Sequence, residues 1–422
     1  MQRERHCHDG SNKLCSGSCL TNTLPIAEHT RHTWSEGKGR YAFLDMYRGI
    51  IVLFMLEGHV LRELLTPDLK ATQFFAFHEV FHGVTAPGFL FGTGFTFAIA
   101  TQRRWEESLT FSRGFFRRMW RALLLILLGY ALHIPFLSLQ KTLTTATFTQ
   151  WNTFFIFDVL QCIGVCLLLM RLLLVTLRQE RLFIAALFML LFSVVYITPL
   201  FWVVEVQQGL PQLLSSAING LTGSPFPLLP YAGFLIAGTC VSWLFLRIGQ
   251  DLDQELFMKR LMLVGVLLII VGVFLDALPF QTYGQEGFWR TSPNYFWIRL
   301  GILLFMLGTL WYLEDFFSSY GGSIAWMPKW LTILGVESFF VYIAHLLILC
   351  GWVTNTDYNL RGWRGGKLDL LEAVLVFLGL TLFMIPSSFL WRYLKKNHIR
   401  FMRGLYWWMG FSVVWSFLFN PY

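Results

Sequence analysis

The stretch FFAFHEVFHGVTAPGFLFGTGFTF, residues 74–97, places two histidines and a glutamate directly before an apolar segment. Residues 84–101 are apolar and long enough to cross a bilayer core of about 30 Å, which takes roughly 20 helical residues. Titratable side chains at such a position are unfavourable unless they are paired or functional. The stretch therefore predicts a membrane helix with a polar cluster at one end.

The rest of the chain repeats this apolar pattern. Of its 422 residues, 55% are hydrophobic and only 14% are charged, which is typical of a polytopic membrane protein. We expect an all-α fold with about eleven transmembrane helices. The predicted spans are residues 43–62, 84–101, 116–137, 152–174, 182–204, 227–248, 257–278, 294–313, 331–353, 369–394 and 401–420.

Lysine and arginine predict the orientation, because short loops rich in these residues stay on the cytoplasmic side. With the N-terminus inside, most of the loop lysines and arginines fall on the inner face. We therefore expect a cytoplasmic N-terminus and a multi-pass protein of the cell inner membrane. The net charge of +8 then reflects contact with anionic membrane lipids, and nothing indicates nucleic-acid binding.

The first 42 residues differ from the remainder, since they are polar and contain no apolar run. We expect residues 1–42 to form a flexible polar cytoplasmic tail and residues 43–422 to form one multispan transmembrane domain. The tail contains two histidines and three cysteines, at His6, Cys7, His8, Cys15 and Cys19. Their spacing matches no compact zinc site, so we expect reduced cysteines and no metal.

Two groups of ionisable residues are predicted at the outer surface. Glu57 and His59 lie at the outer end of the first span, and their spacing points them in different directions. They are therefore unlikely partners unless another helix lies between them. His78, Glu79 and His82 follow on a predicted short outer loop. One histidine there is explained by a bond to a carbonyl, but two with a carboxylate favour a functional site.

Other polar residues are predicted at a similar depth. Asp158 lies about two turns into the fourth span, followed by Gln161, and His133 lies near the outer end of the third. His345 lies in the outer half of the ninth span and Glu337 in its inner half. From depth alone, we expect these residues to line a cavity in the outer leaflet that Gln161 and Glu337 connect inward.

Two charged features are predicted at the inner surface. Asp45 and Arg48 are three residues apart, a spacing that suits a structural ion pair. The inner loop RRWEESLTFSRGFFRR, residues 103–118, carries five arginines, Arg103, Arg104, Arg113, Arg117 and Arg118. Guanidinium groups bind phosphate in a bidentate manner. The ordinary preference for positive inner loops explains the same arginines, so both interpretations stay open.

Histidines at this depth suit proton transfer from a hydroxyl or amine, or direct attack on an acyl group. The chain contains no HExxH, GxSxG, Walker or GxGxxG motif. These observations favour acyl transfer. A proton-coupled small-solute transporter remains the alternative, because the same groups can relay protons. Related halves, which are common in transporters, are not visible.

Four motifs occur in order along the chain: LDMYRG…MLEGH, FHEVFHGVTAPGFLFGTGFTF, VLQCIGV and ESFFVYIAHLL. Together they resemble the multispan acyltransferase family typified by heparan-alpha-glucosaminide N-acetyltransferase, which includes bacterial members. The resemblance extends from about Arg40 to His345. It implies transfer of an acetyl group from cytosolic acetyl-CoA, or another acyl-CoA, to an acceptor on the far side of the membrane. A glycan or lipid-linked sugar is the acceptor class that the resemblance favours.

The resemblance also implies residue roles. His78, five positions before Gly83, matches the family's proposed catalytic histidine. His59 stands where the type enzyme has an asparagine, which is a departure from the family pattern. We expect His78 to act as general base or transient acyl carrier, with His59 and Asp158 orienting it or holding the acceptor. The expected substrate-binding residues are His345, Gln161, Glu79 and His82. The arginine loop is expected to bind the nucleotide end of acyl-CoA, and the sequence leaves a homodimer open.

Overall fold

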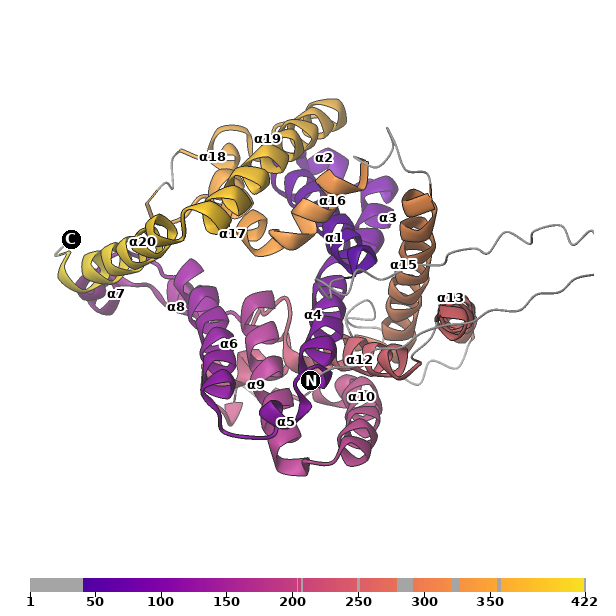
Figure 1. Ribbon diagram of the computed structural model, residues 1–422. Helices are drawn as coiled ribbons and strands as arrows, with labels where there is room; N and C mark the ends of the chain where they lie inside the picture. The colour runs from indigo at the N-terminus through magenta and orange to yellow at the C-terminus, as the bar shows by residue number, and fades with distance from the viewer. Residues whose placement is uncertain are drawn as a thin grey trace, which may run out of the picture. The chain divides into compact units, whose positions relative to one another are not determined.

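The computed structural model describes residues 41–202, 204–205, 208–248, 251–278, 291–319, 327–354 and 358–420. Within these ranges the chain forms helices and no β-strand, so the predicted all-α polytopic fold is confirmed (Figure 1). Residues 1–40 make up nearly all of the expected tail. They lie outside the described residues, and so do the tail cysteines and histidines.

Helices lie at all of the predicted spans. They are α1 (Ala42–Leu64), α4 (Thr85–Gln102), α6 (Arg113–Leu132), α9 (Val159–Leu177), α10 (Glu180–Trp202), α12 (Leu228–Arg247), α13 (Asp251–Asp276), α15 (Pro293–Ser319), the pair α16 (Met327–Val336) and α17 (Ser338–Leu349), α19 (Leu370–Asn397) and α20 (Ile399–Phe419). Shorter helices connect them: α2 (Pro67–Lys70), α3 (Gln73–His82), α5 (Trp105–Ser108), α7 (Leu139–Thr145), α8 (Phe148–Phe154), α11 (Gln212–Ile218) and α18 (Leu360–Arg364).

Fewer helices than the predicted eleven are apolar throughout. Among the described residues, seven helices are long and apolar enough to cross a membrane, or eight if the bent pair α16 and α17 forms one span. Charged residues interrupt α1 and α6, and α20 is rich in tryptophan and tyrosine, which lower its hydropathy. The charges in α1 belong to the polar cluster described below.

The helix α1 organises the half of the fold that holds this cluster. It packs against α3, α4, α15, α16, α17 and α19, and Figure 1 shows it beside α3 and α16. Glycines permit the close approaches. A Cβ atom at Gly49 would lie 2.2 Å from the carbonyl oxygen of Leu331 in α16, and one at Gly88 in α4 would lie 2.3 Å from Ile51. Bulkier residues at these glycines would force the helices apart.

The contact between α4 and α12 is equally close. A Cβ atom at Gly94 would lie 1.9 Å from the carbonyl oxygen of Leu235, and one at Gly238 would lie 2.0 Å from that of Phe91. Each helix therefore presents a glycine to the backbone of the other. This reciprocal contact fixes the position of α4. The helix α4 in turn connects the polar residues of α3, which precede it, to the arginine loop, which follows it.

Local structure differs from expectation at three places. His78, Glu79 and His82 lie on the helix α3 rather than on a loop, because Thr72 caps its start and accepts a hydrogen bond from Phe75 N at 3.3 Å. Asp158 is not two turns into a helix. It precedes α9, and its carboxylate accepts a hydrogen bond from Val159 N at 2.6 Å.

The third difference lies in the ninth span, where α16 and α17 meet at an angle of 80° instead of forming one straight helix. Glu337 stands at the break with its side chain 4% exposed, and its Oε2 lies 2.5 Å from Lys395 Nζ of α19. Arg48 of α1 donates a hydrogen bond to Ser338 Oγ at 2.9 Å. Arg48 Nη1 also lies 3.8 Å from Asp45 Oδ1, within ion-pair distance. Charged groups from α1 and α19 thus stabilise the break.

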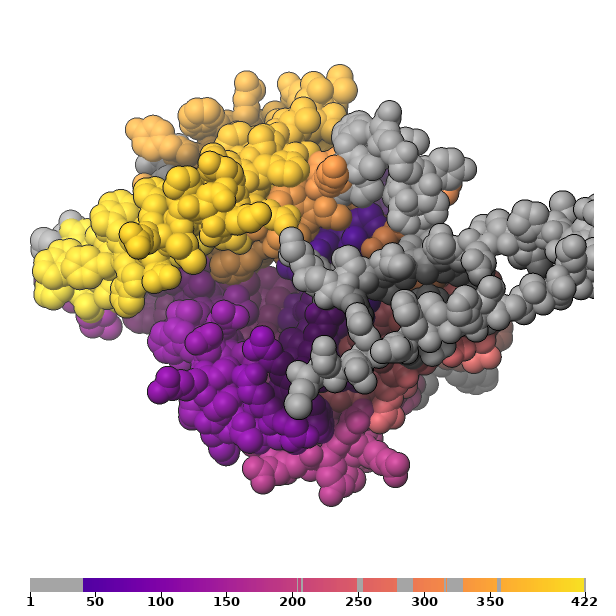
Figure 2. All heavy atoms as spheres, in the orientation of Figure 1, coloured from indigo at the N-terminus to yellow at the C-terminus, as the bar shows by residue number. Residues whose placement is uncertain are grey.

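The last helix, α20, exposes much of its apolar surface. It packs against α19 and α7, and Figure 2 shows both C-terminal helices, in yellow, along one face of the molecule. Its exposed side chains include Trp407, Trp408, Phe411 and Phe419. A continuous apolar and aromatic surface of this kind suits contact with lipid rather than with water.

Candidate functional site

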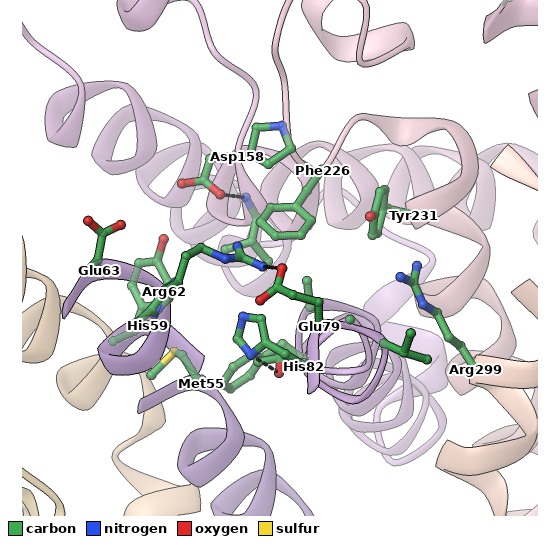
Figure 3. A pocket seen from close by; sticks show the side chains of 18 of the residues that line it. Met55, His59, Arg62, Glu63, Glu79, His82, Asp158, Phe226, Tyr231 and Arg299 are labelled. Atoms are coloured by element: carbon green, nitrogen blue, oxygen red, sulfur yellow. Dashed lines mark hydrogen bonds and ion pairs between the residues drawn. The ribbon is translucent and has the colours of Figure 1, made fainter. Parts of the chain in front are cut away.

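A cavity of about 580 Å³ lies between α1, α3, α4, α9, α12, α15 and α17, and Figure 3 shows its interior. The size is within the range of small-molecule binding sites. Its ionisable lining residues include His59, Arg62, Glu79, His82, Asp158 and Arg299. The expected gathering of polar residues from several helices is therefore present, although not every expected member belongs to it.

His59 lines the cavity from α1 and is held by a second histidine. Its Nδ1 lies 2.9 Å from Nε2 of His345, which is fully buried on α17. His345 Nδ1 lies 2.8 Å from the carbonyl oxygen of Val341. A carbonyl only accepts, so Nδ1 of His345 carries a proton, and in the neutral ring Nε2 accepts from His59 Nδ1. These two hydrogen bonds leave Nε2 of a neutral His59 unprotonated and able to accept a proton.

His78 lies outside the cavity lining. Its Nε2 is 2.7 Å from Oε1 of Glu57, and its Nδ1 faces Oε1 of Glu79 at 3.9 Å. Glu57 and His59 point in different directions from α1, as expected for this spacing, and each contacts a histidine of another helix. His78 and His82 are one turn apart on α3, with parallel rings 6.0 Å apart. The His78 and Glu57 pair therefore supports the cavity wall behind His82.

His82 lies on the cavity side of α3. A Cβ atom at Gly58 would lie 1.8 Å from its Nδ1, so the ring packs directly on the α1 backbone. Thr85 Oγ1 lies 3.5 Å from the same nitrogen. Figure 3 shows the rest of the ring directed toward Glu79 and Arg62. The ring centroid is 6.0 Å from that of His59, so two imidazoles border the same space.

The carboxylates at the cavity have basic neighbours. Glu79 Oε2 lies 2.5 Å from Arg62 Nη2. Asp158 Oδ2 lies 3.9 Å from Nε2 of His133, whose other ring nitrogen contacts the carbonyl oxygen of Gly129 at 2.9 Å. Asp158 therefore lies at the cavity, as expected, but as a helix cap beside His133 rather than beside His78. No cluster of three or more histidine, cysteine, aspartate or glutamate side chains among the described residues is arranged for a metal ion.

Arg299 contributes the most buried charge of the cavity. It lies in the second turn of α15 and is 7% exposed. Its guanidinium carbon lies 3.8 Å from the centre of the Tyr295 ring, which suits a cation–π contact. Our sequence interpretation assigned no role to this residue. Its position in an otherwise apolar helix was the available signal, since an arginine there is unfavourable unless it is used.

Besides His78, four expected residues do not line the cavity. His133 contacts Asp158 from outside the lining. His345 acts behind His59, as described. Gln161 is fully buried against α6, where a Cβ atom at Gly129 would lie 2.3 Å from its Oε1. Glu337 forms an ion pair with Lys395 at the helix break. The expected inward connection through Gln161 and Glu337 is therefore absent from the described cavity lining.

The arginine loop lies at the opposite end of α4 from the cavity. Thr85 and Phe89 at the start of α4 line the cavity, and Arg103 follows its last residue. Eighteen helical residues separate the two ends, a length of about 27 Å at 1.5 Å per residue. The five arginines thus do not line the cavity, and a ligand bound to both regions must extend along α4.

Two of these arginines share one carboxylate. Glu107 lies 3.6 Å from Arg104 Nη1 and 3.4 Å from Arg118 Nη2. Arg171 of α9 is 5% exposed, and its guanidinium carbon lies 5.0 Å from the centre of the Phe97 ring. Its Nη1 is buried without a hydrogen-bond partner among the described residues. Positive charge therefore exceeds negative charge at this end of α4.

A family model described as heparan-alpha-glucosaminide N-acetyltransferase, catalytic, matches residues 40–272, more than half of the chain. The match contains α1, α3, α4 and α9, which supply His59, His82 and Asp158 to the cavity. It ends before α15 and α17. No curated protein matches the chain. The matched region contains three of the four motifs and ends before the fourth, ESFFVYIAHLL. The chain belongs to the heparan-alpha-glucosaminide N-acetyltransferase catalytic family as a multi-pass membrane enzyme of the acyltransferase type.

Proposed function

We propose that this protein transfers an acetyl group from cytosolic acetyl-CoA to a sugar on the other side of the cell inner membrane, either a glycan or a lipid-linked sugar. The family supports acetyl transfer. The observation that carries the proposal is His59, an imidazole at the cavity whose inner nitrogen is held at 2.9 Å by His345. The excess of lysine and arginine in the predicted inner loops supports an orientation with a cytoplasmic N-terminus.

The proposed reaction begins at Nε2 of His59. This nitrogen removes a proton from the hydroxyl or amine of the acceptor while the acceptor attacks the carbonyl carbon of the thioester. The new bond joins the acceptor oxygen or nitrogen to the acyl carbon, and the bond to the CoA sulfur breaks. The proton held by the histidine pair then passes to the leaving thiolate, so the enzyme returns to its starting state.

His345 stabilises the protonated form of His59 in this scheme. When Nε2 of His59 gains a proton, its Nδ1 proton can shift to His345 across the 2.9 Å contact. The carbonyl oxygen of Val341 continues to accept a hydrogen bond from the other nitrogen of His345. The positive charge is thereby shared between two rings, which lowers its free energy in a buried site. His345 is thus a positioning residue in our proposal rather than a substrate ligand.

His78 has a different proposed role from the one that the family pattern implies. Its two ring nitrogens face Glu57 and Glu79, and neither is at the cavity surface. We assign it to the support of His82, on which its ring stacks. The oxyanion of the tetrahedral intermediate requires a hydrogen-bond donor. His82 and Arg62 line the cavity and can donate, whereas Gln161 and His345 do not reach it.

In the proposed function, acetyl-CoA binds at the arginines that follow the last residue of α4. Exposed Arg103, Arg113 and Arg117, together with the less exposed Arg118 and Arg171, provide positive charge for the phosphates of acetyl-CoA. The acyl end then reaches the cavity along α4. This arrangement suits a reaction whose donor enters from the cytoplasm and whose acceptor binds at the opposite face.

Radiolabelled acetyl-CoA tests the function directly. Detergent-purified wild type, His59→Ala and the exposed control His398→Ala are compared for saturable binding and for transfer to amino sugars and membrane glycolipids. We expect all three to bind acetyl-CoA and only His59→Ala to lose transfer, by roughly 10²–10⁴-fold. Absence of acetyl-CoA binding in folded wild type would refute the acyltransferase proposal and favour the transporter.

A further inference from the structure

Arg299 is held rigidly at the cavity wall. Its guanidinium carbon lies 3.8 Å from the centre of the Tyr295 ring. A Cβ atom at Gly83 would lie 2.6 Å from Arg299 Nη2 and 3.1 Å from the Tyr295 hydroxyl. Both Tyr295 and Gly83 also line the cavity. Figure 3 shows the side chain of Arg299 extending from α15 toward the cavity interior. The guanidinium is therefore packed against an aromatic ring and a glycine at the cavity wall.

This buried charge has no counter-charge among the described residues. No carboxylate there lies within ion-pair distance of Arg299, and its Nε has no hydrogen-bond partner. The other arginines near the cavity differ, since Arg62 pairs with Glu79 and Arg361 pairs with Glu63. Guanidinium remains protonated in proteins, and an uncompensated buried charge is strongly destabilising. A bound anion would supply the negative charge that the described residues do not provide.

We propose that the acceptor carries an anionic group, a phosphate or a carboxylate, and that Arg299 binds this group directly. The inference rests on the proposed acyltransferase function and names its acceptor class. Figure 3 places His59 and Arg299 on different sides of the cavity, from α1 and α15. An acidic sugar or a phosphorylated sugar can therefore present its anion to Arg299 and its acyl-accepting group to His59.

This arrangement also provides selection against neutral sugars. A neutral acceptor leaves the buried guanidinium without a counter-charge, whereas an anion can form two parallel hydrogen bonds with its planar edge. A hydrogen bond to a charged group contributes about 1.5–3 kcal/mol, so the anionic sugar should bind roughly 10–100-fold more tightly. Arg299 lies beyond the family-matched residues 40–272, so this selection is a property of the C-terminal part of the chain.

Binding of defined sugars tests the inference without requiring turnover. Calorimetric titrations of the detergent-purified full chain use glucosamine 6-phosphate, glucuronic acid and glucosamine. Wild type should bind at least one of the two anionic sugars at least tenfold more tightly than glucosamine. Arg299→Gln should lose this preference and Arg299→Lys should retain part of it. Arg364→Gln, which alters an exposed arginine that does not line the cavity, should behave as wild type.

Several results would overturn the inference. The inference fails if wild type binds the anionic sugars no more tightly than glucosamine, or does not bind them at all. This result does not depend on whether the variants fold. The inference also fails if folded Arg299→Gln still prefers the anionic sugars to glucosamine. If transfer from succinyl-CoA falls in Arg299→Gln while transfer from acetyl-CoA does not, the anion belongs to the acyl group and not to the acceptor. Acetyl-CoA binding, measured on the same samples, tests the proposed function separately.

Discussion

The two ends of α4 carry ionisable side chains in opposite arrangements. At the cavity end, imidazoles and carboxylates from several helices contact one another in pairs, such as His59 with His345 and Glu57 with His78. At the arginine end, one carboxylate, Glu107, serves two arginines. Paired groups of intermediate basicity suit proton transfer, and surplus guanidinium suits the attraction of phosphate. The difference supports our proposal that the reaction and the capture of the donor occur at separate places.

The largest expected effect is the loss of kcat on substitution of His59, which distinguishes this histidine from His78. His59→Ala should reduce kcat by roughly 10²–10⁴-fold, because it removes the proposed base. His78→Ala should reduce kcat less, since this ring supports His82 from outside the cavity. The check is kcat for both variants at saturating acetyl-CoA. A greater loss in His78→Ala would return the catalytic role to the residue that the family pattern implies.

A second prediction separates stability from chemistry. Lys395→Met leaves the buried Glu337 without its partner at the helix break, and breaking a fully buried pair costs about 3–5 kcal/mol. Because Lys395 is 40% exposed, we expect a smaller loss of about 2 kcal/mol and a melting temperature lower by roughly 4–8 °C. The double variant Glu337→Gln, Lys395→Met should recover most of the lost melting temperature, because no unpaired charge remains buried. An unchanged melting temperature in the single variant would contradict the structural role.

The arginine end should affect donor binding rather than the chemical step. We expect Arg118→Gln to raise the KM for acetyl-CoA by roughly tenfold, the effect of losing one charged hydrogen bond, with little change in kcat. Steady-state kinetics with varied acetyl-CoA provides the measurement. Arg260→Gln, on the separate helix α13, is the matched control. A fall in kcat at constant KM would show that the two ends are not functionally separate.

The smallest effect is expected at the outer rim. Arg361 lies 3.3 Å from Glu63, and its side chain is 60% exposed. Exposed ion pairs contribute at most about 1 kcal/mol, so Arg361→Gln should change transfer by less than roughly fivefold. Transfer assays at low and high salt should agree for this variant. A large loss would mean that Glu63 needs its partner in order to shape the cavity.

Much of the architecture was predictable because membrane helices carry a strong local pattern. The positions of the spans and the divergence of Glu57 and His59 follow from helical geometry alone. The helix α3 was missed because its apolar residues and histidines occur in a short segment, where the cap at Thr72 decides the conformation. The break at Glu337 was missed because the partner that stabilises it, Lys395, lies 58 positions away.

The site was only partly predictable. His59, His82, Glu79 and Asp158 reach the cavity as the sequence suggested. The sequence does not specify which helices are neighbours, so depth alone also selected Gln161, whose side chain faces α6. The same limit concealed the contact between His59 and His345, which are 286 positions apart.

That separation has a consequence for biogenesis. A ribosome adds roughly 5–20 residues per second, and the two histidines are 286 positions apart, so α1 is made roughly 15–60 s before its partner helix. During this interval Arg48 and His59 of α1 lack their partners Ser338 and His345 of α17. They must remain near water or inside the insertion machinery until the last third of the chain arrives. Completion of the site is therefore a late event in membrane insertion, and a chain that stops before α17 cannot form it.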